Sequence, residues 1–137
     1  MLRNIGAVFV GLIAGMIVNM SLVMLNAYVL FPMPEGMDMN DTEAFTSYVV
    51  TLPTAAFVVV LFAHLGQSFV GAWVAARLGS SHALILAMIV GVLSLAGGIA
   101  NMMQIPGPDW MYIELPLYLV VAWVAGRLAE KSRAETS

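Results

Sequence analysis

The stretch Ile5–Phe31, IGAVFVGLIAGMIVNMSLVMLNAYVLF, carries no charged side chain and decides the fold class. A helix of this length reaches roughly 40 Å at about 1.5 Å per residue, which exceeds the bilayer hydrocarbon core of about 30 Å. The run is also far longer than the apolar core of a signal peptide, which has about 7–15 residues. We therefore predict an uncleaved first transmembrane helix that tilts or projects beyond the membrane.

Three further apolar runs follow. We predict four transmembrane spans at about residues 5–31, 53–78, 82–104 and 109–128, with an outer loop at residues 32–52. Only 9% of the residues are charged and the mean hydropathy is +0.94, whereas a soluble domain has about 25% charged residues. The predicted fold class is an all-α membrane protein, a four-helix transmembrane bundle that forms one domain over residues 1–137. In the outer loop, the segment Asn40-Asp41-Thr42-Glu43 is the expected start of a short amphipathic helix from about Thr42 to Thr51.

Charge predicts the orientation of the bundle. All lysines and arginines flank the spans on one side: Arg3, Arg77, Arg127, Lys131 and Arg133. The opposite ends carry acidic residues: Glu35, Asp38, Asp41, Glu43 and Asp109. Because basic loops stay in the cytoplasm, both termini are predicted to be cytoplasmic. The overall form is similar to that of many small bacterial four-helix membrane proteins, which implies a multi-pass protein of the bacterial inner (plasma) membrane with the lipid bilayer as its first partner.

Two segments of the chain recur at corresponding places. AWVAARL at 72–78 closes the second predicted span and AWVAGRL at 122–128 closes the fourth, with six of seven positions identical. AGMIVNM at 14–20 in the first span parallels AGGIANM at 96–102 in the third, with five of seven identical. Since each match falls on the corresponding helix of a hairpin, we predict a parallel duplication with a pseudo-two-fold axis along the membrane normal.

Composition removes several function classes. A net charge of −3 without a basic patch gives no contact surface for nucleic acid. The chain has no cysteine, which excludes disulfides and thiolate chemistry, and we predict no cofactor. A bis-histidine haem within one chain is excluded because His82 lies at the cytoplasmic end, far from His64. Haem held between two protomers by His64 of each stays open.

Polar residues inside the predicted spans are the candidate binding residues, because such groups are costly in a membrane and usually face a cavity or a partner. They are Glu114, Asn26, Asn101, His64, Asn19 and Gln67. Glu114 is expected near the outer surface, at the depth of Asn26 and Asn101, where it either lines a cavity or is merely interfacial. His64 is expected near the midplane beside Asn19, as a neutral residue bonded to Asn or Gln or as a proton relay. The simpler interpretation is that all these side chains belong to packing seams.

Methionine is abundant, at 11 residues. Met33, Met37 and Met39 lie in the acidic outer loop, and thioethers suit Cu(I), so these residues are a possible copper site. The alternative is that methionine fills apolar space.

The primary functional hypothesis is a non-enzymatic structural, accessory or self-assembling membrane component. We expect a homo-oligomer or a subunit of a larger membrane complex, with Gly11–Gly15 and the Gly97/Gly98 region as contact surfaces. The alternatives are a transporter or channel for a small solute, proton or ion that uses an outer-facing cavity around Glu114, and copper handling by the methionine loop. An enzyme is the least supported class, because few acids, bases or nucleophiles are available.

Overall fold

The computed structural model describes residues 1–136, which are helical with no strand among them. Its helices are α1 (Leu2–Leu25), α2 (Thr42–Val49), α3 (Thr54–Leu78), α4 (Ala83–Gln104) and α5 (Glu114–Glu135). A π-helical segment, η1 (Asn26–Leu30), continues α1, and a 3₁₀ segment, η2 (Asp109–Ile113), leads into α5. Four helical stretches are long and apolar enough to cross a membrane: Leu2–Leu30, Thr54–Leu78, Ala83–Gln104 and Asp109–Glu135. The prediction of an all-helical chain with four such helices is confirmed.

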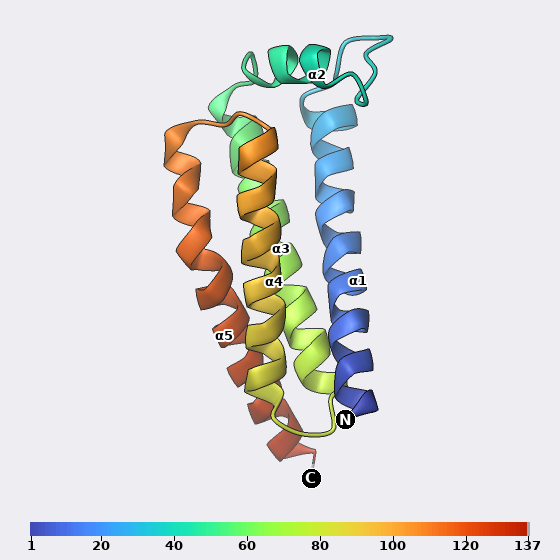
Figure 1. The fold of residues 1–137 in the computed structure, drawn as a ribbon, viewed down its shortest axis with the longest axis vertical. Coiled ribbons are helices and arrows are strands. Elements are labelled where there is room, and N and C mark those ends of the chain that lie inside the picture. The colour runs from blue at the N-terminus through green and yellow to red at the C-terminus, as the bar shows by residue number, and fades with distance from the viewer. Residues whose placement is uncertain (137) are drawn as a thin grey trace.

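The two ends of the structure carry opposite charge. The start of α1, the end of α5 and the turn between α3 and α4 lie together at one end, which we call the basic end because all lysines and arginines lie on the segments there (Figure 1). The other end holds α2 and the two longer connections with their acidic residues, and we call it the acidic end. The short helix α2 lies crosswise over this end, above the junction of α1 and α3 (Figure 1). Its predicted start is confirmed, since the Asp41 side chain accepts hydrogen bonds from the backbone N–H groups of Glu43 and Ala44, both at 3.1 Å.

Helix α3 is the centre of the structure, since it packs against α1, α4 and α5. Helix α1 packs along α3 and touches α4 only lightly, so the four long helices do not close into the symmetric bundle that the sequence suggested. The α1–α3 contact is a glycine seam: a Cβ atom at Gly11 or Gly15 would strike the backbone oxygen of Gly71 or of Gln67. Small residues permit this approach because the hydrophobic effect does not drive helices together in lipid. The prediction of Gly11–Gly15 as an oligomer contact is therefore wrong, because α3 of the same chain occupies that surface.

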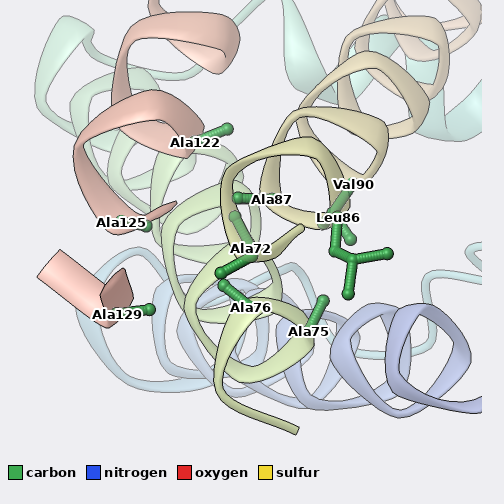
Figure 2. Packing of buried hydrophobic residues seen from close by; sticks show 10 residues of the cluster. Ala72, Ala75, Ala76, Leu86, Ala87, Val90, Ala122, Ala125 and Ala129 are labelled. Atoms are coloured by element: carbon green, nitrogen blue, oxygen red, sulfur yellow. The ribbon is translucent and has the colours of Figure 1, made fainter. Parts of the chain in front are cut away.

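Helices α3, α4 and α5 enclose a core made mainly of alanine. Figure 2 shows Ala72 and Ala76 of α3, Ala87 of α4, and Ala122 and Ala125 of α5 converging between the ribbons. All five are completely buried. At Gly91 of α4 a Cβ atom would lie 2.5 Å from the Ala122 Cβ, so these helices approach as closely as their side chains allow.

Hydrogen bonds at the basic end tie the N- and C-terminal segments to the end of α3. Arg3 Nε donates to the Leu78 carbonyl at 2.9 Å, and Arg133 donates to the Ala76 carbonyl at 3.0 Å. Both guanidinium groups satisfy carbonyls that have no partner within the helix, at the end where the helix dipole favours cations. Beyond Glu130 the chain stays helical to Glu135.

Ser80 and Ser81 lie directly before His82 and α4, but neither side chain caps that helix. Both bind Asn4 of α1: the Asn4 carboxamide oxygen accepts from Ser80 N–H at 2.8 Å, and its Nδ2 donates to Ser81 Oγ at 3.1 Å. The residue before α4 is His82, which adopts a left-handed conformation with φ of 54°. The serine hydroxyls are therefore used to hold the start of α1 rather than the start of α4.

The glycine seam can be tested on α1 itself. We expect Gly15→Ala to lower the free energy of unfolding by roughly 1–3 kcal/mol, because the added methyl group forces the α1 and α3 backbones apart. The matched control is Gly6→Ala on the same helix, where the methyl group meets nothing within 4 Å. That change should be neutral or stabilising by up to about 1 kcal/mol, from helix propensity. Denaturant titration in detergent micelles, followed by tryptophan fluorescence, measures both, and equal stabilities would contradict the seam.

Candidate functional site

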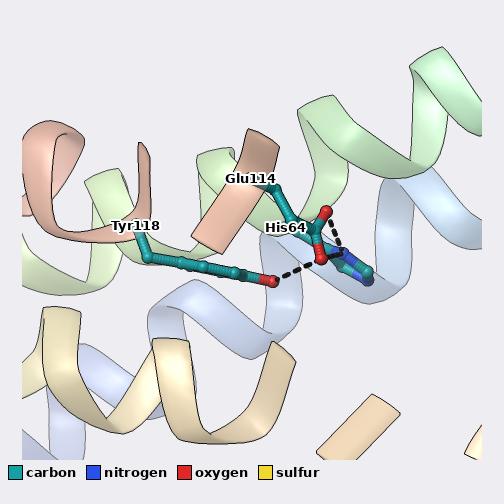
Figure 3. Close-up of polar contacts among 3 residues, drawn as sticks. All are labelled: His64, Glu114 and Tyr118. Carbon is teal, nitrogen blue, oxygen red and sulfur yellow. Dashed lines mark hydrogen bonds and ion pairs between the residues drawn. The ribbon is translucent and has the colours of Figure 1, made fainter. Parts of the chain in front are cut away.

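A histidine–glutamate pair lies between α3 and α5. His64 Nδ1 is 3.0 Å from Glu114 Oε2 and 3.2 Å from Oε1, so one ring nitrogen faces both carboxylate oxygens (Figure 3). Glu114 is fully buried and His64 is only 8% exposed. An isolated buried carboxylate would be costly, and a hydrogen-bonded partner compensates for that cost. The expectation that Glu114 is merely interfacial is wrong, as is the expected bond from His64 to an Asn or Gln side chain.

The geometry restricts where protons reside. In one state the neutral imidazole donates Nδ1–H to the carboxylate, and the other nitrogen, Nε2, carries a lone pair. Adding one proton gives either an imidazolium or a protonated carboxyl group beside it, and the pair changes from a charge of −1 to zero. The two states of this buried pair thus differ by one proton and one unit of charge.

Tyr118 and Ser68 complete the polar cluster. The Tyr118 hydroxyl donates to Glu114 Oε1 at 3.4 Å, and the Tyr118 ring stacks near His64 with centroids 6.4 Å apart. Ser68 Oγ donates to the Tyr118 carbonyl at 3.0 Å, which ties α3 to α5 one turn further toward the basic end. On the opposite side, Gly98 of α4 leaves room for the tyrosine ring, since a Cβ atom there would lie 2.5 Å from Tyr118 Cε2.

The local sequence places Glu114 at the start of α5. Pro116 has no N–H to donate to the carbonyl four residues earlier, so the α-helical pattern begins at Glu114 and the preceding turn is 3₁₀. A 3₁₀ segment rises about 2 Å per residue against about 1.5 Å for an α-helix, which carries Glu114 deeper than its sequence position suggested. The carboxylate also lies in the first turn of α5, where the helix dipole favours negative charge.

A pocket of about 180 Å³ opens at the acidic end and reaches this pair. Its wall is formed by η1, α2 and η2, by the connections at this end, and by the acidic-end halves of the long helices. Its principal lining residues are Asn26, Phe31, Met33, Met39, Phe45, Tyr48, Phe57, His64, Asn101, Met102, Met111, Tyr112 and Glu114. The pocket is thus apolar and aromatic along most of its wall, with polar groups gathered at a few points. We call it the acidic-end pocket.

Asn26 stands where α1 changes to the wider π-helix η1, and such irregular turns often occur at functional sites. Its Nδ2 donates to the Ala56 carbonyl of α3 at 3.2 Å. Its Oδ1 is buried and has no hydrogen-bond partner among the residues described. A buried acceptor left without a donor is uncommon and calls for an explanation, such as a ligand or a water that fills it.

The structure brings four of the six candidate binding residues to one place, since Glu114, His64, Asn26 and Asn101 all line the acidic-end pocket. Asn19 and Gln67 are outside that lining. Asn19 Oδ1 is buried and has no hydrogen-bond partner among residues 1–136. The backbone oxygen of Gln67 lies against Gly15 of α1 in the glycine seam. Sequence reasoning missed that Ser68 and Tyr118 belong to the polar cluster.

The three methionines of the outer loop, Met33, Met37 and Met39, do not all lie in the same place. Met33 and Met39 line the acidic-end pocket together with Met102 and Met111, which come from other segments, whereas Met37 does not. Within residues 1–136, no group of three or more histidine and carboxylate side chains is arranged to hold a metal ion. Copper binding by thioethers stays a prediction.

Comparisons with protein-family models, with curated proteins and with solved structures give no match for this chain. Any function must therefore be inferred from the site itself.

The buried pair gives a stability prediction. His64→Ala leaves the Glu114 carboxylate buried without its main partner, and we expect the free energy of unfolding to fall by about 3–5 kcal/mol. Glu114→Gln keeps a neutral group that can still bond to Nδ1, so a smaller loss of about 1–3 kcal/mol is expected. The control is Glu43→Gln on exposed α2, which should change stability by less than about 0.5 kcal/mol. A loss in His64→Ala no larger than in this control would refute the pairing.

The close contact between Gly98 and the Tyr118 ring gives a second stability prediction. Gly98→Ala places a methyl group against the tyrosine ring and should lower the free energy of unfolding by roughly 1–3 kcal/mol. Its neighbour Gly97 has nothing within 4 Å of an added Cβ, so Gly97→Ala is the matched control and should be neutral or slightly stabilising. The same denaturant titration measures both. Equal values would mean that the Tyr118 ring does not lie against α4.

Proposed function

We propose that this chain is a multi-pass membrane protein that binds a small solute in the acidic-end pocket, and that binding is linked to the proton held by His64 and Glu114. The observation that carries the proposal is a fully buried carboxylate, paired with a histidine, at the wall of a pocket that is open at one end. Ionisable groups at membrane depth commonly mark substrate pathways and proton relays. The geometry favours this function over the purely structural role that the sequence placed first.

A second observation supports a binding role. Buried side-chain oxygens without a hydrogen-bond partner among residues 1–136 occur at Asn19, Asn26 and Ser94, and of these three only Asn26 lies in the lining of the pocket. His64 Nε2, which lies on the far side of the ring from Glu114, likewise has no hydrogen-bond partner among residues 1–136 (Figure 3). Unfilled acceptors at the wall of a pocket are what a solute-binding site requires.

The proposal includes an orientation. With the basic end in the cytoplasm, the acidic-end pocket opens to the outside of the bacterial inner membrane. Self-association or docking on a larger membrane complex remains compatible with this role, because the lipid-facing side of α1 is broadly apolar and exposed. Gly97 lies on the exposed surface of α4 and stays a candidate for such a contact, whereas Gly98 is covered by Tyr118.

The proposal also includes an origin by duplication of a helical hairpin, supported by a constant offset. His64 bonds to Glu114 and Ser68 bonds to Tyr118, and both pairs are separated by 50 positions. The same offset relates the two cation–π pairs, each with 5.9 Å between guanidinium and ring: Arg77 over Trp73 and Arg127 over Trp123. Residues that are equivalent in the two hairpins therefore meet each other across α3 and α5, as expected around a pseudo-two-fold axis. Helix α1 departs from this symmetry by lying on the α4 side of α3.

Pocket access tests the function and the orientation together. Because the chain lacks cysteine, Met102→Cys places a single thiol in the pocket wall, and Ala134→Cys places one at the basic end. In right-side-out vesicles, a membrane-impermeant maleimide should label the first variant and should label the second only after the membrane is permeabilised. A panel of single-ring solutes of each charge type is then added, and at least one should slow labelling of Met102→Cys. If none does so, the proposed function is wrong.

Equivalence of the two hairpins predicts the outcome of an exchange. His64→Glu alone places two acids together and Glu114→His alone places two histidines together, and each should destabilise the protein. The double variant restores one acid and one histidine at equivalent positions, so we expect it to recover at least half of the summed loss in free energy of unfolding. A double variant as unstable as that sum would show that the positions are not equivalent.

A further inference from the structure

We propose that the ligand of the acidic-end pocket is a small amphipathic ammonium, an amine with one aromatic ring whose N–H groups bind Glu114, His64 and Asn26. This inference rests on the proposed function and names the chemical class of the solute. Three independent features of the pocket carry it: the hydrogen-bonding role of its unfilled polar atoms, its charge, and its size and wall.

The unfilled polar atoms are acceptors. Asn26 Oδ1 is a carbonyl oxygen with no donor, in a side chain only 7% exposed. When the imidazole donates Nδ1–H to Glu114, His64 Nε2 carries a lone pair and has no partner in the described chain. The Glu114 carboxylate has about four acceptor positions, and among residues 1–136 only His64 and Tyr118 bond to it. A ligand that fits must therefore bring several N–H or O–H donors.

The charge of the site selects a cation among such donors. No lysine or arginine belongs to the pocket lining given by residues 1–136, and the basic residues lie on segments at the other end of the structure. With a neutral imidazole the pair carries a charge of −1, deep in a site with little water to screen it. The acidic-end connections add Glu35, Asp38 and Asp109 near the entrance. An anion would meet repulsion at every step, whereas an ammonium is attracted and can donate up to three hydrogen bonds.

The volume and wall define the remainder of the ligand. A cavity of about 150 Å³ accommodates benzene, so the observed 180 Å³ holds one aromatic ring with a short chain. Phe31, Phe45, Tyr48 and Phe57 give the wall aromatic faces, which attract both rings and cations. Methionine thioethers add flexible surface that adapts to an apolar body.

Binding of the cation should compete with one proton. When the pair takes up a proton its charge becomes zero, and an imidazolium also loses the Nε2 lone pair, so the ammonium loses both attraction and an acceptor. The titratable groups on the surrounding acidic-end helical segments are Tyr118 on α5, Tyr28 on η1, Glu43 and Tyr48 on α2, and Asp109 and Tyr112 on η2. Helix α4 contributes none, and α1, α3 and α5 carry their other charged residues only at their distant, basic ends. The cation therefore binds with release of up to one proton, and its affinity falls as the pH is lowered.

Titration calorimetry of the full chain in lipid nanodiscs tests this inference with 2-phenylethylamine as the probe. Its controls are 2-phenylethanol, phenylacetate and trimethyl(2-phenylethyl)ammonium, which is a cation without N–H donors. We expect the amine to bind at least tenfold more tightly than each control, and its affinity to fall by up to tenfold per pH unit in acid. Glu114→Gln should weaken binding by at least tenfold and abolish the pH dependence, and Asn26→Ala should weaken binding several-fold. Glu43→Gln and Asn40→Ala, on the exposed loop and α2, should change neither.

The outcomes separate the two proposals. If the alcohol, the carboxylate or the trimethyl cation binds as tightly as the amine, the ammonium assignment is overturned while solute binding stands. If no member of the panel binds, and none slows labelling of Met102→Cys, the proposed function fails as well. If Glu114→Gln does not fold, the pH dependence of amine binding to the wild-type chain decides, since an affinity that is flat from acid to neutral pH would overturn proton competition.

Discussion

The close approach of α3 to α5 is the constraint on which the site depends. Alanine at the facing positions lets two parallel helices pack with almost nothing between them, and the alanine core extends this contact toward the basic end. Only at that separation can Ser68 reach the Tyr118 backbone and His64 reach Glu114. A larger side chain in the core would separate the helices and leave the carboxylate in an apolar interior without a partner. The polar site and the apolar packing are therefore parts of one structural requirement.

The sequence was sufficient for those features that depend on local composition. Four apolar stretches, the charged ends, and the start of α2 at Asp41 follow from residue type and spacing, and the structure agrees with them. The presence of polar side chains inside apolar spans also identified Glu114, His64, Asn26 and Asn101, which do share one pocket. These residues could be found because polar groups in an apolar helix are rare and must face inward.

The features that the sequence did not reveal are those that depend on how helices are placed relative to one another. The 3₁₀ turn before Glu114 was not anticipated. Glu114 was expected near the outer surface and His64 near the midplane, so the two were not recognised as partners. Gly11 and Gly15 form the same pattern whether they meet a neighbour in the same chain or in another chain, and sequence cannot distinguish the two. The offset of 50 positions was present in the repeated AWVA segments. Carried back along the helices, it pairs His64 with Glu114 and Ser68 with Tyr118, which is the signal that could have found the cluster.

The length and the position of α1 have a consequence for the membrane around the protein. The helical stretch Leu2–Leu30 covers 29 residues, or roughly 43 Å at about 1.5 Å per residue, and exceeds the thickness of an ordinary bilayer core. A helix that is too long for its bilayer tilts, and the angle changes with membrane thickness. Here α1 is bonded to the α3 side at both of its ends, by Arg3 at the basic end and by Asn26 at the acidic end, and it interlocks with α3 along the glycine seam between them. We therefore expect α1 and α3 to tilt together as one unit, which keeps Asn26 in its place in the pocket wall when the thickness of the membrane changes.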